Sequence, residues 1–270
     1  MIEYYRCYLN QIGQRGRRPL FYIVRRGQNR YNRAMSTRLN KYIASAGLCS
    51  RRKADELISN GNVKVNGAVV NEMGFVVEDG DRVTVNGRLI EGEKPKVYVA
   101  LNKPLGYITS MDDDKNRATV ADLVSDIPER LFPVGRLDYN TTGLLIMTND
   151  GELTYSLTHP KHEVGKTYVA TVAGVMSGKR LAQLRKGVDI GGFVTSPARV
   201  RVLRQNPRSA VVEITIHEGK NRQVRKMFAA VGNQVQSLER IAIGELKLGR
   251  LKEGHYRKLT RQEIEYLKGL

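Results

Sequence analysis

Apolar residues recur at helical spacing soon after residue 38. The positions i, i+3, i+4 and i+7 are occupied by Leu39, Tyr42, Ile43 and Ala46. Such a stripe is typical of an amphipathic helix that packs one face on a core. Ser50 is a suitable N-cap for a second helix, which would end at the Asn60-Gly61 pair.

Two strand–turn–strand patterns follow, over residues 63–70 and 83–90. Each contains an Asn-Gly pair between alternating apolar residues, which favours a tight hairpin turn. The two helices and these strands predict a compact module over residues 36–90. The polar segment 91–96 contains Pro and Gly and is typical of a linker.

The pattern after residue 96 mixes alternating and helical stretches. Predicted strands cover residues 97–101, 144–148, 168–172, 197–203 and 210–216, and predicted helices cover residues 119–124, 151–158 and 179–186. A further helix is predicted after the Gly219 turn, with Val224, Met227 and Phe228 facing inward. We therefore expect an α+β protein in which a second domain, residues 97–270, follows the small module.

The whole chain is strongly basic, with a net charge of +18 and a sequence pI near 10.0. This balance indicates a polyanionic partner, either nucleic acid or an acidic membrane surface. The sequence contains no run of 18 apolar residues, so no transmembrane helix is predicted. It has only two cysteines, Cys7 and Cys49, which favours a reducing cytoplasm. The four histidines are too scattered to predict a metal site.

Residues 1–35 differ from the rest, with eight Arg, no Lys and one acidic residue. They show no clean period, and an amphipathic targeting peptide, a disordered basic tail and a mis-called start before Met35 all remain open. The other residues still carry +11. The expectation of a polyanionic partner therefore does not depend on this tail.

A short polar motif near the middle of the chain carries the candidate chemistry. In an extended segment, Arg136 and Asp138 would point to one face and Leu137 into the core. Two such charges are ordinarily a solvated surface pair. The run VGRLDYNTTGLLIMTNDGEL, however, closely resembles the signature of the RsuA/RluB-type pseudouridine synthases. That resemblance implies that Asp138 is the catalytic residue. We expect Asp138 to act as the nucleophile, although attack at C1′, attack at C6 and removal of a sugar proton are all open.

Two further catalytic roles follow from the same resemblance, those of a tyrosine and of an arginine. Tyr168 in Lys-x-Tyr would stack on the target base, although a lone tyrosine of this kind is more often a core residue. An Arg of the segment EGKNRQVRKMF would pair with Asp138, and Arg225 is favoured over Arg222. Arg136 would fill the gap that the extruded nucleotide leaves.

The N-terminal run RLNKYIASAGLCSRRKADELISNGNVKVNG resembles the S4-type RNA-binding domain. That resemblance implies RNA contacts by Arg38, Lys41, Arg51, Arg52 and Lys53, to phosphates and shape rather than to bases. In the second domain we expect further RNA contacts from Lys103, Lys166, Lys220 and Lys226. For Lys103, a solvated loop lysine is an equally good interpretation.

These resemblances together predict an rRNA pseudouridine synthase, an isomerase that needs no cofactor and no metal. Its S4-like module would precede a largely antiparallel sheet with helices on its outer faces. Asn140 favours the branch of the family that acts on large-subunit rRNA. The alternative is a non-catalytic RNA-binding ribosome-assembly factor with the same fold. We expect a cytoplasmic monomer, and the lack of a basic amphipathic helix with large apolar residues disfavours a membrane-surface protein.

Overall fold

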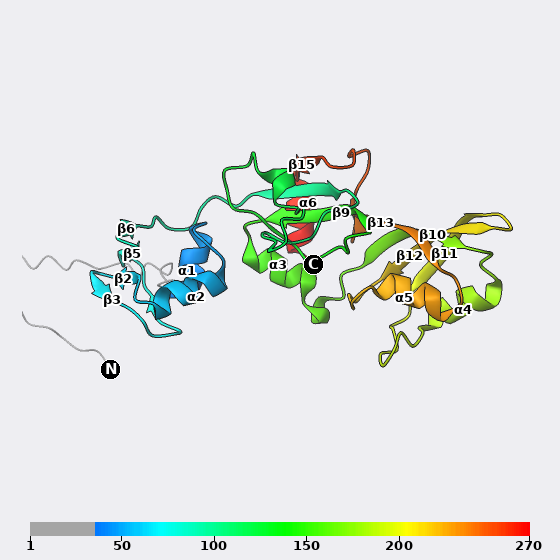
Figure 1. Ribbon diagram of the computed structural model, residues 1–270, viewed down its shortest axis with the longest axis horizontal. Helices are drawn as coiled ribbons and strands as arrows, with labels where there is room; N and C mark the ends of the chain where they lie inside the picture. Colours follow the sequence, from blue (N-terminus) through cyan, green and yellow to red (C-terminus); the bar gives the residue numbers. More distant parts are fainter. Residues whose placement is uncertain (1–35) are drawn as a thin grey trace, which may run out of the picture.

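The protein is described by a computed structural model in which residues 36–270 are placed. The predicted basic tail, residues 1–35, lies outside this range. Along the longest axis, a small N-terminal module is followed by the two halves of one large sheet (Figure 1). Among the described residues, no helix is long and apolar enough to cross a membrane.

The N-terminal module has the two helices and the hairpins that the apolar pattern predicts. Its elements are β1 (Thr37–Arg38), α1 (Leu39–Ser45), α2 (Arg51–Ser59), β2 (Val63–Val65), β3 (Ala68–Val69), β4 (Val76–Val77), β5 (Val83–Val85) and β6 (Arg88–Leu89). The Ser50 hydroxyl accepts the Lys53 N–H at 3.2 Å, which confirms the predicted cap. Asn66 and Gly67 both adopt positive φ, as a two-residue hairpin turn requires. The four-stranded sheet runs in the order β3-β2-β5-β6.

The rest of the chain builds a nine-stranded sheet with the main order β11-β12-β10-β13-β9-β7-β15. Its strands are β7 (Tyr98–Lys103), β8 (Phe132–Pro133), β9 (Thr142–Thr148), β10 (Lys166–Ala173), β11 (Arg199–Gln205), β12 (Ser209–Ile216), β13 (Val235–Ile243), β14 (Leu246–Lys247) and β15 (Tyr256–Lys258). Nearly all pairs are antiparallel, and the predicted α+β class is confirmed.

Helices cover this sheet unevenly. They are η1 (Asp122–Val124), α3 (Gly151–Thr158), η2 (Pro160–His162), α4 (Gly178–Lys186), α5 (Gln223–Ala230) and α6 (Arg261–Lys268), where η marks a single 3-10 turn. The predicted helix over residues 119–124 is thus shorter, because the Thr119 N–H and hydroxyl are bonded to the Asp122 carboxylate. All six residues of β7 are buried, whereas β12 alternates between buried and half-buried residues. The first pattern is typical of a strand covered on both faces and the second of a strand covered on one.

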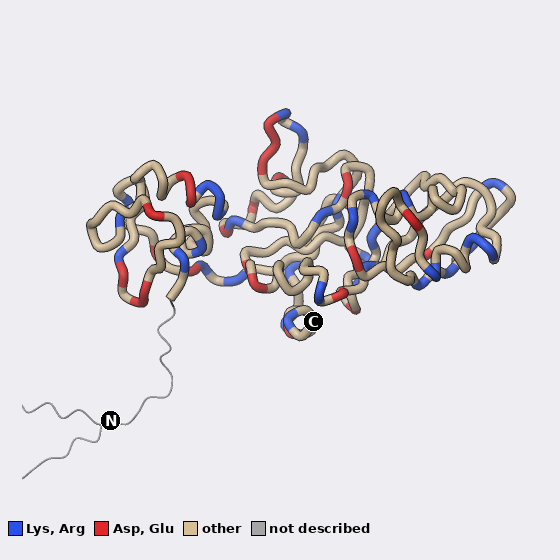
Figure 2. The backbone as a smooth tube through the Cα atoms, turned by 90° about the horizontal axis from the view of Figure 1, so that it is seen from below, with Lys and Arg blue, Asp and Glu red and all other residues tan. Residues whose placement is uncertain are grey.

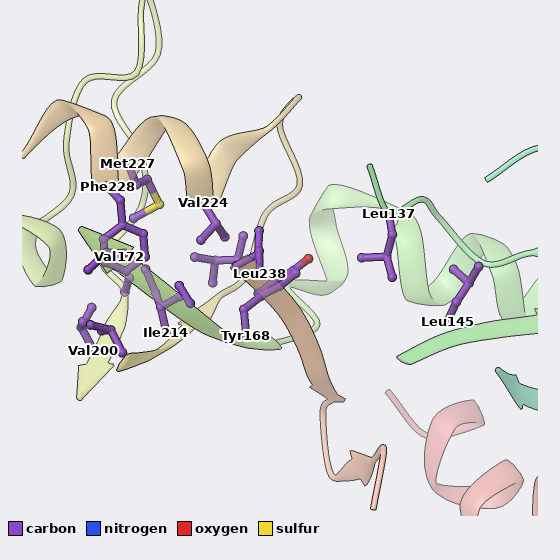
Figure 3. Packing of buried hydrophobic residues seen from close by; sticks show 14 of the residues in the cluster. Leu137, Leu145, Tyr168, Val172, Val200, Ile214, Val224, Met227, Phe228 and Leu238 are labelled. Carbon is purple, nitrogen blue, oxygen red and sulfur yellow. The ribbon is translucent and has the colours of Figure 1, made fainter. Parts of the chain in front are cut away.

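The sheet separates two apolar clusters in the second domain. The larger cluster packs α5 and α4 on β10, β11 and β12, and it extends to Leu137 and Leu145. Figure 3 shows Tyr168 at the edge of this cluster, on the side that faces Leu137. The smaller cluster packs α3 and α6 on β7 and β9. The two halves of the sheet therefore meet near Leu137 and Tyr168.

The seam between the two halves is the one parallel pair among the described strands, β9 with β13. It is short, with Thr142 opposite Glu239 and Gly143 opposite Arg240. Gly143 has a φ of +103°, and a Cβ atom there would lie 2.7 Å from the Arg240 backbone nitrogen. Only glycine allows the two strands to approach this closely. The last glycine of the central motif is therefore needed to close the sheet.

Lys and Arg residues occur along the whole length of the molecule rather than in one part of it (Figure 2). The N-terminal module and the second domain both contribute them. The expected basic character is therefore shared by both domains. An exposed ion pair, Lys41 Nζ to Glu152 Oε1 at 3.2 Å, joins α1 to α3 across the boundary.

Candidate active site

A pocket of about 730 Å³ lies at the seam of the sheet. The segment 134–139, between β8 and β9, forms one wall of it. The strands β10 and β13 and the turn before α5 contribute the others. Of the catalytic residues predicted from the sequence, the pocket is lined by Arg136, Asp138, Tyr168 and Arg222. The fold thus brings together residues that lie up to 86 positions apart.

The loop that carries Asp138 alternates as the sequence predicts. Leu137 is 6% exposed and belongs to the larger apolar cluster, while Arg136 is exposed and Asp138 is half-buried. The Thr109 hydroxyl bonds both to the Leu137 carbonyl, at 2.7 Å, and to its N–H, at 3.2 Å. These contacts fix the backbone between the two charged residues. Sequence reasoning missed Thr109, because nothing near it in the chain indicates this contact.

Three cations bind backbone carbonyls of the same loop and of the strand that follows it. Lys103 Nζ donates to the Thr141 carbonyl at 3.0 Å, and an Arg225 Nη donates to the Asn140 carbonyl at 2.5 Å. Arg240 Nε donates to the Leu144 carbonyl at 2.7 Å. Charged donors make stronger hydrogen bonds than neutral ones, so these contacts hold the chain after Asp138 in one conformation.

The prediction that Lys103 contacts RNA is wrong. Its side chain is fully buried, at the end of β7, and Nζ donates to the carbonyls of Pro104 and Thr141. Burial lowers the pKa of Lys103 to about 8, and the negative charges of Asp138 and Glu253 oppose this shift. A lysine with no exposed surface cannot reach a phosphate, so Lys103 acts inside the protein.

The direct pairing of Arg225 with Asp138 that the sequence predicts is not formed. Asp138 makes no side-chain hydrogen bond or ion pair within residues 36–270, and Arg225 lies outside the lining of the pocket. Its two Nη atoms are bonded to the carbonyls of Asn140 and Val235, and that occupation is the physical reason. Burial and the neighbouring Arg222 lower the pKa of Arg225, while the charge of Asp138 opposes this.

Tyr168 has features of both predicted roles, a core residue and a residue that contacts the target base. It is 8% exposed and packs in the larger apolar cluster, as a core tyrosine would. It also lines the pocket, and it lies opposite Arg240 in the register of β10 and β13. Part of the ring therefore borders the pocket.

The turn before α5 supplies further basic residues at the rim. Arg222 adopts a left-handed conformation with φ of 52°, which is unusual for a residue with a side chain and places it at the pocket. Lys220 lies over the Phe193 ring at 4.5 Å, and both residues line the pocket. Lys226 is exposed on α5, while Lys166 is half-buried at the start of β10.

The five predicted RNA-binding residues of the N-terminal module are all exposed. They are Arg38, Lys41, Arg51, Arg52 and Lys53. Two of them make exposed ion pairs, Lys41 with Glu152 and Lys53 with Glu56. Such pairs contribute little and can exchange for phosphate contacts. Nowhere in residues 36–270 do three or more metal-ligating side chains gather.

Comparison with known proteins matches both parts of the chain. The model of the RNA pseudouridylate synthase family matches residues 97–230, and that of the S4 domain matches residues 37–83. The chain is 47% identical over 235 residues to the ribosomal large subunit pseudouridine synthase B of Bacillus subtilis, covering 86% of this chain and 96% of that protein. It is 43% identical to an uncharacterized RNA pseudouridine synthase of Aquifex aeolicus, covering 86% of this chain and 94% of the relative.

A solved structure shows the same architecture. A crystal structure of a pseudouridylate synthase superposes with a TM-score of 0.62 at 34% sequence identity. The match covers 85% of this chain and 99% of the solved one. The likeness therefore extends over both the N-terminal module and the large sheet.

Proposed function

Since the chain belongs to the RNA pseudouridylate synthase family and is an isomerase of that kind, we propose that it converts one uridine of large-subunit ribosomal RNA to pseudouridine, with Asp138 as the nucleophile. The observation that carries the role of Asp138 is its place in the pocket. Its carboxylate has no partner among the described residues, and its loop is held by Thr109 and by three cations. The large-subunit target is supported by the name of the Bacillus subtilis relative.

The reaction breaks the bond between N1 of the uracil and C1′ of the ribose and joins C5 to C1′. It needs one ionised carboxylate held at the ribose, and it takes up no electrons and no phosphate. Asp138 is half-buried, and the positive charges of Lys103 and Arg225 act on it. A carboxylate at this place is the type of side chain that serves as a nucleophile in covalent catalysis.

The uridine must leave the RNA stack to reach Asp138, at a cost of a few kcal/mol. Arg136 is exposed beside Asp138 and lines the pocket, and its role in this proposal is to enter the gap that the extruded uridine leaves in the RNA. Tyr168 offers its ring to the extruded base, because stacking on an aromatic face needs no hydrogen-bond partner. Arg225 acts as a positioning residue through the Asn140 carbonyl.

RNA binding is divided between the two domains. The exposed basic residues of the N-terminal module, in residues 36–90, contact phosphates and fix the RNA on the enzyme. Lys220, Arg222 and Lys226 extend this basic surface to the pocket of the catalytic domain, residues 97–270. The segment 91–96 joins the two domains.

The test uses the native protein and the Asp138→Asn variant on unmodified rRNA, with pseudouridine mapped by carbodiimide labelling and reverse transcription. We expect one new stop in large-subunit rRNA with the native protein and none with the variant. Asp114→Asn, which changes an exposed carboxylate of a surface loop, is the matched control and keeps the stop. RNA binding by the native protein without any stop would instead favour the ribosome-assembly factor.

A further inference from the structure

Two cations, Lys166 and Arg240, face the pocket from neighbouring strands and have no negative partner among the described residues. Arg240 is 3% exposed. Its one hydrogen bond within residues 36–270 is donated by Nε to the Leu144 carbonyl. Among residues 36–270, no acceptor bonds its buried Nη2, and Lys166 donates only to the Val164 carbonyl, at 2.9 Å. Both side chains line the pocket.

This arrangement costs free energy in the empty site. Burial lowers the pKa of Lys166, and repulsion by Arg240 lowers it further. A buried guanidinium nitrogen without an acceptor has lost its hydration and gained nothing in exchange. The two side chains therefore form a site for a ligand that supplies hydrogen-bond acceptors and negative charge.

The register of the sheet indicates which part of the RNA would bind Arg240 and Lys166. Arg240 lies directly opposite Tyr168, so the two side chains stand next to each other on the same face. A base that stacks on the Tyr168 ring has its edge beside Arg240. The edge of uracil carries two acceptors, O2 and O4. Phosphates are better matched to Lys220 and Arg222, which are exposed at the rim.

We propose that Arg240, with Lys166 beside it, binds a carbonyl oxygen of the target uracil and stabilises the negative charge that the ring takes up during isomerisation. This inference rests on the proposed function. When the N1–C1′ bond breaks, its electron pair passes to the ring and spreads to O2 and O4, and the Asp138 carboxylate bonds C1′ in place of the ring. The ring then attacks C1′ through C5 and displaces the carboxylate, loses the C5 proton and gains one at N1, so that no atom is gained or lost. Fixed donors in a dry pocket stabilise such charge most strongly.

The experiment measures single-turnover rates of the native protein, Arg240→Gln and Lys166→Gln. The substrates are RNAs with uridine, 2-thiouridine or 4-thiouridine at the position that the native protein modifies, because sulfur is a weak acceptor. On uridine RNA we expect Arg240→Gln to lower the rate about 100-fold, with RNA affinity changed less than about threefold. One of the two sulfur substitutions lowers the native rate about tenfold and costs Arg240→Gln nothing further, because both changes remove the same contact.

A purely structural role of Arg240 gives a different result. The inference is overturned if, with both thiouridine RNAs, the loss of rate caused by the sulfur adds to the loss of rate caused by Arg240→Gln. It is also overturned if Arg240→Gln lowers RNA affinity as much as it lowers the rate, because that result indicates a phosphate contact. Arg199→Gln, an exposed arginine on β11, is the matched control and keeps the native rates. If Arg240→Gln does not fold, the test uses the single-turnover rates of the native protein and of Lys166→Gln. A native rate that neither thiouridine lowers then overturns the inference. If the native protein leaves unmodified rRNA unchanged, the proposed function fails and this inference fails with it.

Discussion

Lys103 shows how one buried charge serves the loop of the active site. Its ammonium group donates to the carbonyls of Pro104 and Thr141, and it has no exposed surface. Burial lowers its pKa to about 8, whereas a lysine in the unfolded chain has its ordinary pKa of 10.5. Between these two values the unfolded chain binds the additional proton. The folded protein therefore gains stability as the pH rises through this window.

The change Lys103→Met tests this pH dependence. We expect the free energy of unfolding of the native protein, relative to that of the variant, to rise by about 2 kcal/mol from pH 8 to pH 10. Denaturant titrations at several pH values measure it. Lys186→Met, which alters an exposed lysine on α4, should show no such trend. A constant difference between native protein and Lys103→Met would mean that Lys103 keeps an ordinary pKa.

Gly143→Ala tests the close approach of β9 to β13. A Cβ at Gly143 would meet backbone atoms of Arg240, which cannot move without separating the strands, and the φ of +103° is itself strained for alanine. We expect a loss of about 3 kcal/mol in the free energy of unfolding. Gly151→Ala is the control, because a Cβ at this first residue of α3 meets nothing. Thermal denaturation of both variants compares them, and equal stabilities would contradict the close contact.

The helix α5 has two faces with two tasks. Val224, Met227 and Phe228 are buried against the sheet. Arg225 donates a hydrogen bond to the Asn140 carbonyl. Lys226, the next residue, is exposed. One helix thus anchors the loop of Asp138 and carries an exposed charge, which we propose binds the RNA.

Arg225→Met and Lys226→Met form a matched pair on this helix. Loss of Arg225 frees the Asn140 carbonyl, and we expect the single-turnover rate to fall about 100-fold with little change in RNA affinity. Loss of Lys226 removes a phosphate contact, so RNA affinity should fall and the rate at saturation should stay. Arg225→Lys, which keeps a charged donor, should restore part of the rate. Equal effects of both Met variants on affinity would refute the division of tasks.

The whole molecule combines a small RNA-binding module with a catalytic sheet. The module presents Arg51, Arg52 and Lys53 on one exposed turn of α2, and the pocket lies in the second domain. Phosphate contacts release counterions, so they make RNA binding depend on salt. We therefore expect contacts by the module to add affinity that does not depend on the chemistry proposed at Asp138.

The triple change Arg51→Gln, Arg52→Gln and Lys53→Gln in the full chain tests this contribution. We expect weaker rRNA binding and a slope of log affinity against log salt that is smaller by about 2. The rate at saturating enzyme should stay near that of the native protein. Filter binding over a range of salt concentrations measures the slope. The pair Lys179→Gln and Lys186→Gln on α4 is the control, and an unchanged slope in the triple variant would place the RNA elsewhere.

Local patterns were sufficient for much of the fold. The helical stripe of α1, the Ser50 cap and the Asn-Gly turns all depend on residues a few positions apart, and each is confirmed. The alternation around Leu137 likewise placed that residue in the core. Lys103 was assigned wrongly, because a Pro-Gly segment follows it and only the packing on both faces of β7 buries it.

The sequence by itself determined the α+β class, the two domains' motifs and the residues that resemble the signature of the family. Periodicity, caps and turns act over a few residues and can be interpreted along the chain. Only the tertiary structure decided that Lys103, Arg225 and Arg240 bind carbonyls of the same segment. Those contacts join residues 38 to 96 positions apart, and they depend on strand register and on the seam at Gly143, which no local pattern specifies.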